Sequence, residues 1–521
     1  MKKITLLSAI LISFSVFATT RNVPGTYATI QAGLNACLNG DTVLVQPGTY
    51  TQNIVWPNLA NIKLFSAGDT SNTIINGGGV ATVITISVNT DTNTIIKGFK
   101  ITNGYGNTTF TNAGGVQVQS GGVKFLNCLI SNNNPGGGST LYAYGAGAYV
   151  GGTNSVFDNV VFRNNNSSSG GYGFGGAMYI PTNTTVRMRN CIARSNLVTA
   201  ANYCWGGGIN SEGNLILSNS TIENNSTSSG GYNFGGGIAI TAGTATITNV
   251  KIINNTLGGT PNFIWGGGLY TDGASTTNLT NVLIAGNILS NSSFVNGGGG
   301  IHIEGANTSL IAIQITVSEN RRANNGTITG SGLQVETSAS ATINNSIFWN
   351  TNGGAEIDNN SSTVTINYSD VRGGFFGIGD INTNAMFVST TDFHLQMTSP
   401  CAGVGTLSGA PNYDLDNNMR PMPALTNPDM GCYEVSQLVG IAENNLEHNF
   451  SVYPNPASDN LFVIMSEAKN LILYNSLGEE VSNWNLSAGT NEINISDLSS
   501  GIYFLELKTE SGVVMKKIIK E

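Results

Sequence analysis

Eight copies of a short glycine-rich segment, spaced 29 to 32 residues apart, constrain the fold of this chain more than any other feature. Each copy has three small residues followed by a run in which apolar residues recur. The copies read AGGVQV from Ala113, GAGAYV from Gly145, GGAMYI from Gly175, GGGINS from Gly206, GGGIAI from Gly235, GGGLYT from Gly266, GGGIHI from Gly298 and GSGLQV from Gly330. A unit of this length cannot bury its apolar face alone and must stack on the next unit. The spacing therefore predicts a solenoid with one coil per copy.

Each coil also carries two polar positions six residues apart, both usually Asn. The first position holds Asn127, Asn159, Asn190, Asn219, Asn249, Asn281, Gln314 and Asn345. The second holds Asn133, Asn165, Asn196, Asn225, Asn255, Asn287 and Asn320. Amides aligned on stacked coils donate to one neighbour and accept from the other, which satisfies polar groups at the turns. Because the apolar residues between them recur with period two, we predict an all-β parallel β-helix solenoid, with a short helix from Thr29 to Leu38 over its N-terminal end.

Composition limits the partners of such a solenoid. The net charge is -9 and only 10% of the residues are charged. We expect no nucleic acid partner, because phosphate neutralisation needs clustered Lys and Arg that the coils lack. An anionic glycan would be repelled overall unless calcium bridges it.

Residues 1–18 are expected to be a signal peptide. Lys2 and Lys3 precede an apolar stretch that ends at Phe17, and Val16 and Ala18 suit the positions before a cleavage site. The apolar stretch is shorter than the about 20 residues that a membrane-spanning helix needs. No other segment is suited to span, so we expect no transmembrane span after cleavage.

The opening VPGTYATIQAGLNACLNGDTVLVQPGTYTQNI, from Val23 to Ile54, resembles the start of parallel β-helix proteins of the pectin-lyase-like superfamily. The glycine-triplet and Asn coils resemble the repeats of that superfamily, and the resemblance covers about residues 21–373. It implies that the coil is right-handed, as does the steric preference for right-handed parallel crossovers. We assign residues 19–435 to this domain, with its N-terminal cap and its C-terminal end segment.

The end segment contains FHLQMTSPCAGVGT, DLDNNMRP and DMGCYE, and is similar to the end of secreted bacterial β-helix proteins with a choice-of-anchor region. Cys401 and Cys432 flank this segment and are the best candidates for a disulfide in an exported protein. In those relatives small residues often stand at both positions, which also favours the pairing. Cys128 and Cys191 lie two coils apart, beyond disulfide reach, and are expected to be core thiols.

After a polar linker, residues 436–449, the charge rises and the glycine content falls. Residues 450–521 alternate apolar and polar residues between turn signals, as in a small antiparallel β-sandwich. The motifs PNP, LGEE and GIYF and the terminal lysines closely resemble the type A C-terminal sorting domain of the type IX secretion system of Bacteroidota. The resemblance implies contact with that secretion machinery, passage across the outer membrane, and a cell-surface or extracellular location.

Outward positions of stacked coils form columns, and one column is a candidate ligand-binding or catalytic site. Asp272, Glu304 and Glu336 fall on consecutive coils, at about 5 Å spacing, close enough to raise one pKa or to share a calcium ion. Tyr270 and His302 are expected to border these carboxylates and to offer a sugar a stacking face. A solvated acidic stripe without a ligand is the simpler interpretation.

Two weaker signals lie elsewhere. Asp414, Asp416 and Asn418 have the D-x-D-x-N opening of a calcium loop, but Met419 replaces the glycine and Leu425 the bidentate Glu. Arg163, Arg194 and Glu223 share an outward position and are interpreted as surface charges. No cofactor is certain, and calcium is the candidate.

These features predict a secreted cell-surface β-helix protein that binds or adheres to an extracellular polysaccharide. Two alternatives stay open. The first is a polysaccharide-degrading enzyme, a lyase or a glycoside hydrolase, working at Asp272, His302, Glu304 and Glu336, although the pectinase motifs GHG, QDTL, DFIFG and RxPxxR are absent from the sequence. The second is a passive surface-structural protein.

Overall fold

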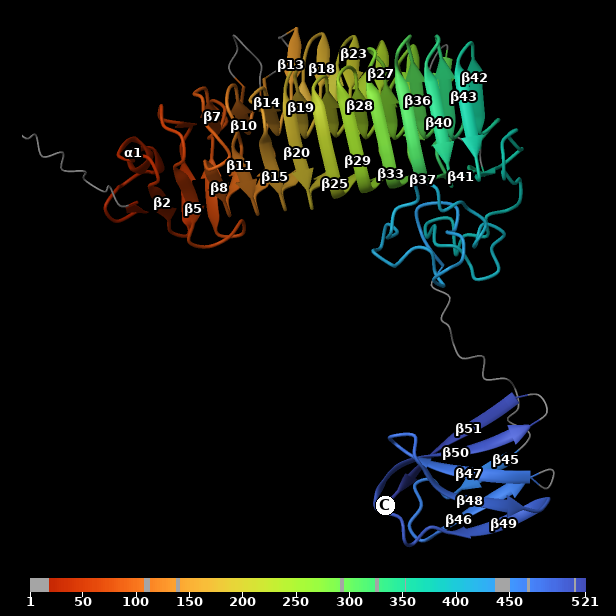
Figure 1. Ribbon diagram of the computed structural model, residues 1–521. Coiled ribbons are helices and arrows are strands. Elements are labelled where there is room, and N and C mark those ends of the chain that lie inside the picture. The colour runs from red at the N-terminus through yellow and green to blue at the C-terminus, as the bar shows by residue number, and fades with distance from the viewer. Residues whose placement is uncertain are drawn as a thin grey trace, which may run out of the picture. The chain divides into compact units, whose positions relative to one another are not determined.

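The computed structural model describes residues 18–106, 113–136, 141–290, 295–323, 328–351, 353–435, 450–465, 469–509 and 512–521. The chain divides into two compact units, Met1–Ser436 and Gln437–Glu521, and each is described by itself (Figure 1). Residues 1–17 of the predicted signal peptide and the whole predicted linker, residues 436–449, lie outside the described residues.

The first unit is a β-solenoid whose strands stack coil upon coil in parallel, as predicted (Figure 1). Its largest sheet, here the long sheet, takes one or two strands from each coil. The strands are β1 Thr20–Val23, β2 Thr42–Val45, β3 Gly48–Thr51, β5 Lys63–Ser66, β6 Thr73–Asn76, β8 Ile95–Lys97, β9 Lys100–Thr102, β11 Lys124–Leu126, β12 Leu129–Ser131, β15 Ser155–Asp158, β16 Val161–Arg163, β20 Thr185–Arg189, β21 Ile192–Arg194, β25 Asn214–Glu223, β29 Thr244–Ile253, β33 Thr276–Ala285, β37 Ser309–Ser318, β40 Ser340–Asn344, β41 Ile347–Trp349, β43 Thr363–Asn367 and β44 Asp370–Val371.

The second sheet, here the triplet sheet, is formed mainly by the strands that follow the glycine triplets and closes the other side of the core. Its strands are β4 Ile54–Val55, β7 Ile84–Ile86, β10 Val116–Val118, β14 Ala148–Val150, β19 Met178–Ile180, β24 Ile209–Ser211, β28 Ile238–Ile240, β32 Leu269–Thr271, β36 Ile301–Glu304, β39 Leu333–Glu336 and β42 Ile357–Asn360.

Two further parallel sheets were not predicted. Their strands lie between the closing Asn of one coil and the glycine triplet of the next coil. The facing sheet contains β17 Asn166–Ser168, β22 Leu197–Ala200, β26 Ser226–Ser229, β30 Thr256–Gly259, β34 Ile288–Leu289 and β38 Arg321–Arg322. The aromatic sheet contains β13 Tyr142–Tyr144, β18 Tyr172–Phe174, β23 Tyr203–Trp205, β27 Tyr232–Phe234, β31 Phe263–Trp265 and β35 Val295–Gly297. The two sheets bury small apolar clusters between them, such as Val198, Ala200 and Cys204.

The closing Asn residues form the predicted amide ladder inside the solenoid. Asn225 is fully buried, and its Nδ2 donates to Asn255 Oδ1 (3.0 Å) and to the Ala193 carbonyl (2.9 Å). Its own Oδ1 accepts from Asn196 Nδ2 (2.9 Å). The ladder ends at Asn350, whose main-chain and side-chain nitrogens both donate to the Glu356 carboxylate at 2.6 Å. The ladder therefore satisfies its buried amide groups within the protein.

The other corners use left-handed backbone. Asn219 and its equivalents bend the long sheet with φ near +50°, a conformation that Asn tolerates better than most residues. At the triplets the first glycine has positive φ, and a Cβ on Gly235 would lie 2.2 Å from the Ile238 carbonyl oxygen. The glycine is therefore required by both conformation and space.

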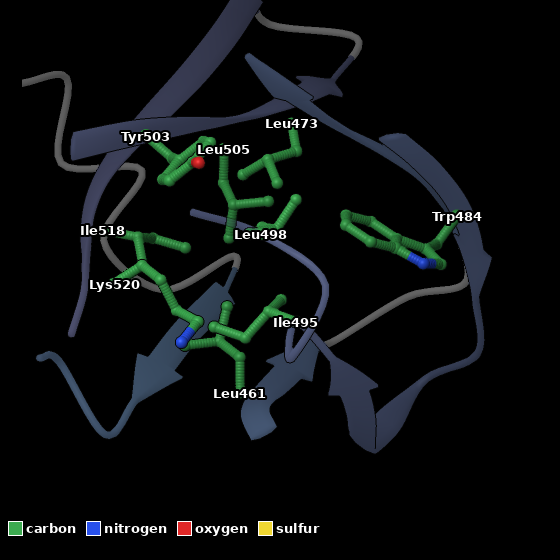
Figure 2. Close-up of a pocket in the computed structure, with 9 residues that line it drawn as sticks. All are labelled: Leu461, Leu473, Trp484, Ile495, Leu498, Tyr503, Leu505, Ile518 and Lys520. Carbon is green, nitrogen blue, oxygen red and sulfur yellow. The ribbon is translucent and has the colours of Figure 1, made fainter. Parts of the chain in front are cut away.

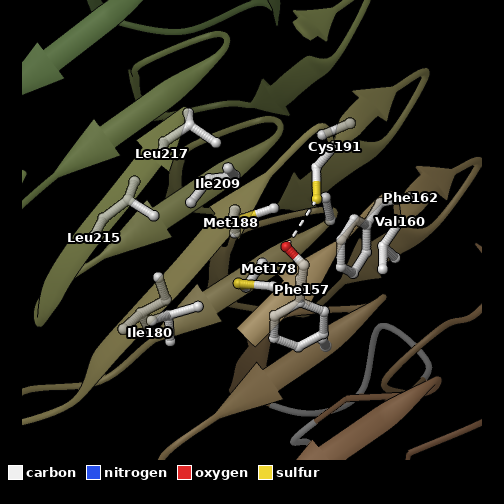
Figure 3. Packing of buried hydrophobic residues seen from close by; sticks show 14 of the residues in the cluster. Phe157, Val160, Phe162, Met178, Ile180, Met188, Cys191, Ile209, Leu215 and Leu217 are labelled. Carbon is white, nitrogen blue, oxygen red and sulfur yellow. Dashed lines mark hydrogen bonds between the residues drawn. The ribbon is translucent and has the colours of Figure 1, made fainter. Parts of the chain in front are cut away.

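One continuous apolar core fills the solenoid, with aromatic and sulfur-containing side chains from successive coils in contact (Figure 3). Phe125 and Phe157 stack with ring centroids 5.0 Å apart. Cys128 and Cys191 are buried free thiols, as predicted, and the Cys191 thiol donates to the Phe157 carbonyl (3.4 Å).

The N-terminal end is covered by helix α1 Ile30–Asn35, within the predicted range. The Thr29 hydroxyl caps the helix by accepting from the Ala32 amide (3.0 Å). Ile30 and Leu34 face the core, so the helix covers the first coil instead of leaving its strand edges open.

The end segment, residues 374–435, packs against the outer face of the long sheet. Asn281 Nδ2 donates to the Tyr413 carbonyl (2.6 Å), and the Cys432 amide donates to Thr316 Oγ1 (3.0 Å). These bonds join the segment to coils more than 100 residues earlier in the chain.

The predicted disulfide between Cys401 and Cys432 is not formed, because both are buried free thiols. The Cys401 thiol donates to Asp370 Oδ2 (3.2 Å) within one apolar cluster. Cys432 lies in another cluster, with Leu283 and Phe393. The two thiols therefore lie in separate apolar clusters.

The second unit contains two antiparallel sheets around an apolar interior. One contains β45 Phe450–Tyr453, β46 Asn460–Met465 and β49 Gly489–Asn494, and the other β47 Lys469–Asn475, β48 Glu480–Leu486, β50 Gly501–Thr509 and β51 Gly512–Lys520. The cavity in Figure 2 lies in this interior, between side chains such as Leu461, Leu473 and Trp484. Its lining has few of the converging polar groups that fix the orientation of a ligand in a binding site. No helix in the described ranges of either unit is long and apolar enough to cross a membrane.

Candidate functional site

The triplet sheet brings the predicted column together. Tyr270 on β32 lies opposite His302 on β36, and Glu304 lies opposite Glu336 on β39. The Tyr270 hydroxyl donates to Asp272 Oδ2 (2.9 Å) and also contacts Glu304 Oε1. The sequence therefore predicted the correct neighbours in this column.

The predicted exposure of the two rings is wrong. Tyr270 is 1% exposed and His302 is fully buried. Their rings lie 5.6 Å apart, and the aromatic sheet covers them, with Phe234 4.7 Å from Tyr270 and Trp265 5.8 Å from His302. The rings consequently offer no free face to a sugar.

The carboxylates differ in their electrostatics. Burial raises the pKa of Asp272 to about 6, with Glu304 adding repulsion. Burial alone would also raise the pKa of Glu304, but the neighbouring His302 imidazole and the Tyr270 hydrogen bond hold it below its usual value. Glu336 accepts from Gln334 Nε2, which also donates to Asp358 Oδ2 (3.0 Å). Asp358 is thus a fourth carboxylate of this cluster, and it was missed because β42 lies beyond the last recognised glycine triplet.

The three residues of the predicted calcium loop are engaged by the protein itself. Asp414 is buried and accepts from the amides of Asp416, Asn418 and Glu434 at 2.7 to 2.9 Å. Asp416 Oδ2 lies 2.7 Å from His394 Nε2. Asp414 therefore stabilises a turn, and its donor set does not converge on a free position.

A cleft of about 700 Å³ separates the end segment from the long sheet. His394 lies in it and holds Asp392 Oδ1 at 2.5 Å and Asp416 Oδ2 at 2.7 Å, one on each ring nitrogen. Burial lowers the pKa of His394, but these two hydrogen bonds outweigh it and raise the pKa above its usual value. Because both nitrogens are engaged, His394 is suited to joining the segment rather than to proton transfer.

A second groove, of about 380 Å³, was not predicted from the sequence. We call it the arginine groove; it lies on the long sheet beside the turn at Gly68 and Asp69. Its lining residues are Ser66, Gly68, Asp69, Thr70, Lys97, Gly98, Asn127, Cys128, Leu129, Asn159, Val161, Arg163 and Arg194. Arg163 and Arg194 lie opposite each other on adjacent strands.

The two arginines, interpreted from the sequence as surface charges, line this groove. Both are half-buried, and the Nε atom of each is buried with no hydrogen-bond partner among the described residues. Asp69 is the one carboxylate in the lining, against three cationic side chains. The sequence showed that the two arginines share one position in the coil. The turn that forms the other wall of the groove lies about three coils earlier, and the sequence did not show that it lies next to them.

The aromatic sheet was also missed, although it has a clear signal. An aromatic-x-aromatic triplet directly precedes five glycine triplets: YAY, YGF, YCW, YNF and FIW. The rings stack along the solenoid; Trp205, for example, lies 4.8 Å from Phe174 and 5.3 Å from Phe234. Because their faces are occupied by one another, they stabilise the sheet and present mainly edges to solvent.

Comparison with known proteins identifies the second unit. Residues 451–521 match the family described as the secretion system C-terminal sorting domain. The chain ends in a sorting domain. The sorting domain directs type IX secretion across the outer membrane to the cell surface or extracellular space and implies contact with the secretion machinery.

Two solved structures are similar to the chain. One is described as "Crystal structure of pectate lyase Pel9A", with 13% identity, a TM-score of 0.38, and coverage of 81% of this chain and 97% of that chain. The other is a pectin methylesterase from carrot, with 10% identity, a TM-score of 0.25, and coverage of 65% and 82%. The solenoid is established by its strand pairings. No curated protein matches the chain.

Proposed function

We propose that this secreted β-solenoid binds an acidic extracellular polysaccharide, and that the arginine groove holds its anionic sugars. The observation that carries the proposal is the pair of buried, unpartnered Nε atoms of Arg163 and Arg194 on adjacent strands. A buried donor without a partner costs about 1–3 kcal/mol, and more when it is charged. A ligand in the groove that accepts from the other nitrogens of both guanidinium groups would offset the two adjacent positive charges.

Carboxylate and sulfate oxygens suit these donors best, because a planar guanidinium binds such groups through paired hydrogen bonds. Lys97 adds a third positive charge, and Asn127 and Asn159 add amides that can bind sugar hydroxyl groups. The lining is therefore suited to a chain that alternates charge and hydroxyl groups.

The net charge of -9 does not oppose this proposal in the way that the sequence suggested. At physiological salt, charges more than about 8 Å apart are largely screened. An anion in the groove consequently interacts mainly with the three local cations. Bridging calcium is not required.

The test is retention of residues 19–521 on a polyuronate, a sulfated galactan and a neutral glucan. We expect retention on at least one acidic chain and none on the neutral glucan. The double variant Arg163→Gln/Arg194→Gln should bind the acidic chain at least about tenfold more weakly, which corresponds to about 1.4 kcal/mol.

Arg187→Gln is the matched control, because it removes one positive charge from an exposed position on β20 outside the groove. It should bind like the wild type. Equal binding by the double variant, or retention on all three polysaccharides alike, would contradict the proposal.

A polysaccharide-degrading enzyme is the second candidate, and one contact favours it. The Tyr270 hydroxyl holds both Asp272 and Glu304, which brings two carboxylates close together. The same retained samples should be assayed for unsaturated products and new reducing ends. Chain ends that are lost in Asp272→Asn would establish the enzyme, and retention without chain ends supports the binding protein.

A further inference from the structure

His302 has one ring nitrogen without a partner in the middle of the acidic column. Its Nε2 is buried and makes no hydrogen bond among the described residues. It lies 3.9 Å from Glu304 Oε2, too far for a hydrogen bond. One ligand atom each from His302, Glu304 and Glu336 lies within 4.8 Å of the others.

Gln334 determines which ring nitrogen carries the proton. Its Nε2 donates to Glu336 and to Asp358 Oδ2, so its Oε1 must be the atom that faces His302. The Nδ1 of His302 lies 3.3 Å from that oxygen and donates to it. In the neutral imidazole this arrangement leaves the lone pair of Nε2 free and directed toward Glu304. An Nδ1–H bond to a fixed oxygen is the usual support of a metal-binding histidine.

Four carboxylates surround His302, and their negative charge favours a bound cation. Asp272, Glu304, Glu336 and Asp358 follow one another along neighbouring strands, joined through Tyr270 and Gln334. No lysine or arginine pairs with any of the four in the parts of the chain that the structure describes. The Oδ1 of Asp272 is also buried without a hydrogen-bond partner. The four carboxylate residues are half-buried, and a cation bound between neighbouring carboxylates offsets their mutual repulsion.

We propose that His302 Nε2, Glu304 and Glu336 bind a divalent transition-metal ion, with zinc as the representative ion. Imidazole together with carboxylate is a donor set that suits zinc, whereas calcium takes oxygen ligands only. The calcium that the sequence suggested for these carboxylates is therefore replaced by a softer ion. Gln334 acts as a positioning residue, because it orients the imidazole without contacting the ion.

This site is independent of the arginine groove, and its test uses zinc alone. Metal-free residues 19–521, without a histidine tag, are dialysed against Zn²⁺, and bound zinc is measured together with the thermal unfolding midpoint. We expect one zinc per chain and a raised midpoint. His302→Gln and Glu336→Gln should each weaken binding at least about tenfold, and an excess of Ca²⁺ should not displace the zinc.

His394→Gln is the matched control, because His394 also lies between two carboxylates but has both ring nitrogens engaged. It should bind zinc like the wild type. If His302→Gln fails to fold, the zinc affinity of Glu336→Gln tests the proposal. The carboxylate of Glu336 is partly exposed at the rim of the column, so this variant is expected to fold. The absence of zinc binding, or zinc binding that survives both substitutions, would overturn the proposal.

Discussion

At the scale of single residues, asparagine has two separate roles in each coil. The Asn at the bend adopts positive φ, as at the exposed Asn219 and the half-buried Asn249, while the buried Asn six residues later builds the ladder. Only the second role satisfies main-chain groups of neighbouring coils, through bonds such as that of Asn225 to the Ala193 carbonyl. The ladder positions should therefore be far more sensitive to substitution than the strand surface.

Asn225→Ala is expected to lower the free energy of unfolding by about 3 kcal/mol, because it leaves several buried donors and acceptors without partners. Denaturant unfolding of residues 19–521 measures the change. Thr246→Ala, at an exposed position on β29, is the control and should change stability by less than about 0.5 kcal/mol. A small effect of Asn225→Ala would mean that the ladder does not stabilise the coil.

Asp41 gives the N-terminal cap a defined pH dependence. Burial would raise its pKa, but the amides of Leu38 and Thr19 and the guanidinium of Arg21 outweigh burial and hold the pKa below 3.8. Since the carboxylate has a lower pKa in the folded than in the unfolded state, its contribution is present above about pH 4. The contribution is lost as the pH falls through the folded-state value.

Asp41→Asn should therefore destabilise the solenoid by about 3 kcal/mol at neutral pH, where it breaks a buried pair with Arg21. The difference from the wild type should be constant from pH 7 to about pH 4 and shrink below it. Unfolding curves at five pH values between 2.5 and 7 test this. A difference that grows on acidification would contradict the assignment.

At the scale of elements, the glycine triplets set where each coil turns into the triplet sheet. Gly235→Ala should cost at least about 3 kcal/mol, because it adds a left-handed penalty to a Cβ placed 2.2 Å from a carbonyl oxygen. Gly230→Ala is the matched control in the same coil, where the nearest atom would be 3.4 Å away, and it should cost less than about 1 kcal/mol. Equal effects in thermal unfolding would contradict a special role for the triplet.

The elements that the sequence predicted are those whose corners are each set by a single residue type, glycine or asparagine. The spacing of the triplets and Asn pairs fixed the register of the triplet sheet, and so the order of Asp272, Glu304 and Glu336 was right. Burial of Tyr270 and His302 was not predicted, because it depends on the aromatic sheet, whose strands are too short to be recognised by periodicity. The arginine groove was missed because it needs Arg163 and the turn at Gly68 to meet across several coils.

At the scale of the whole molecule, the solenoid and the sorting domain have separate cores and separate tasks. The sorting domain accounts for delivery across the outer membrane. The polar and charged features that we assign to ligands, the arginine groove and the acidic column, all lie in the first unit. Binding should consequently be a property of the solenoid, whether or not the sorting domain is present.

The most direct measurement is the salt dependence of the affinity of residues 19–521 for a polyuronate oligomer. If Arg163 and Arg194 hold the anionic sugars, the affinity falls as salt rises. Arg163→Gln/Arg194→Gln removes two cations and should flatten the slope of the logarithmic plot by roughly 1.4 to 1.8, at about 0.7 to 0.9 per charge. An affinity that does not depend on salt, or a slope that is the same in the wild type and the double variant, would contradict the proposed binding site.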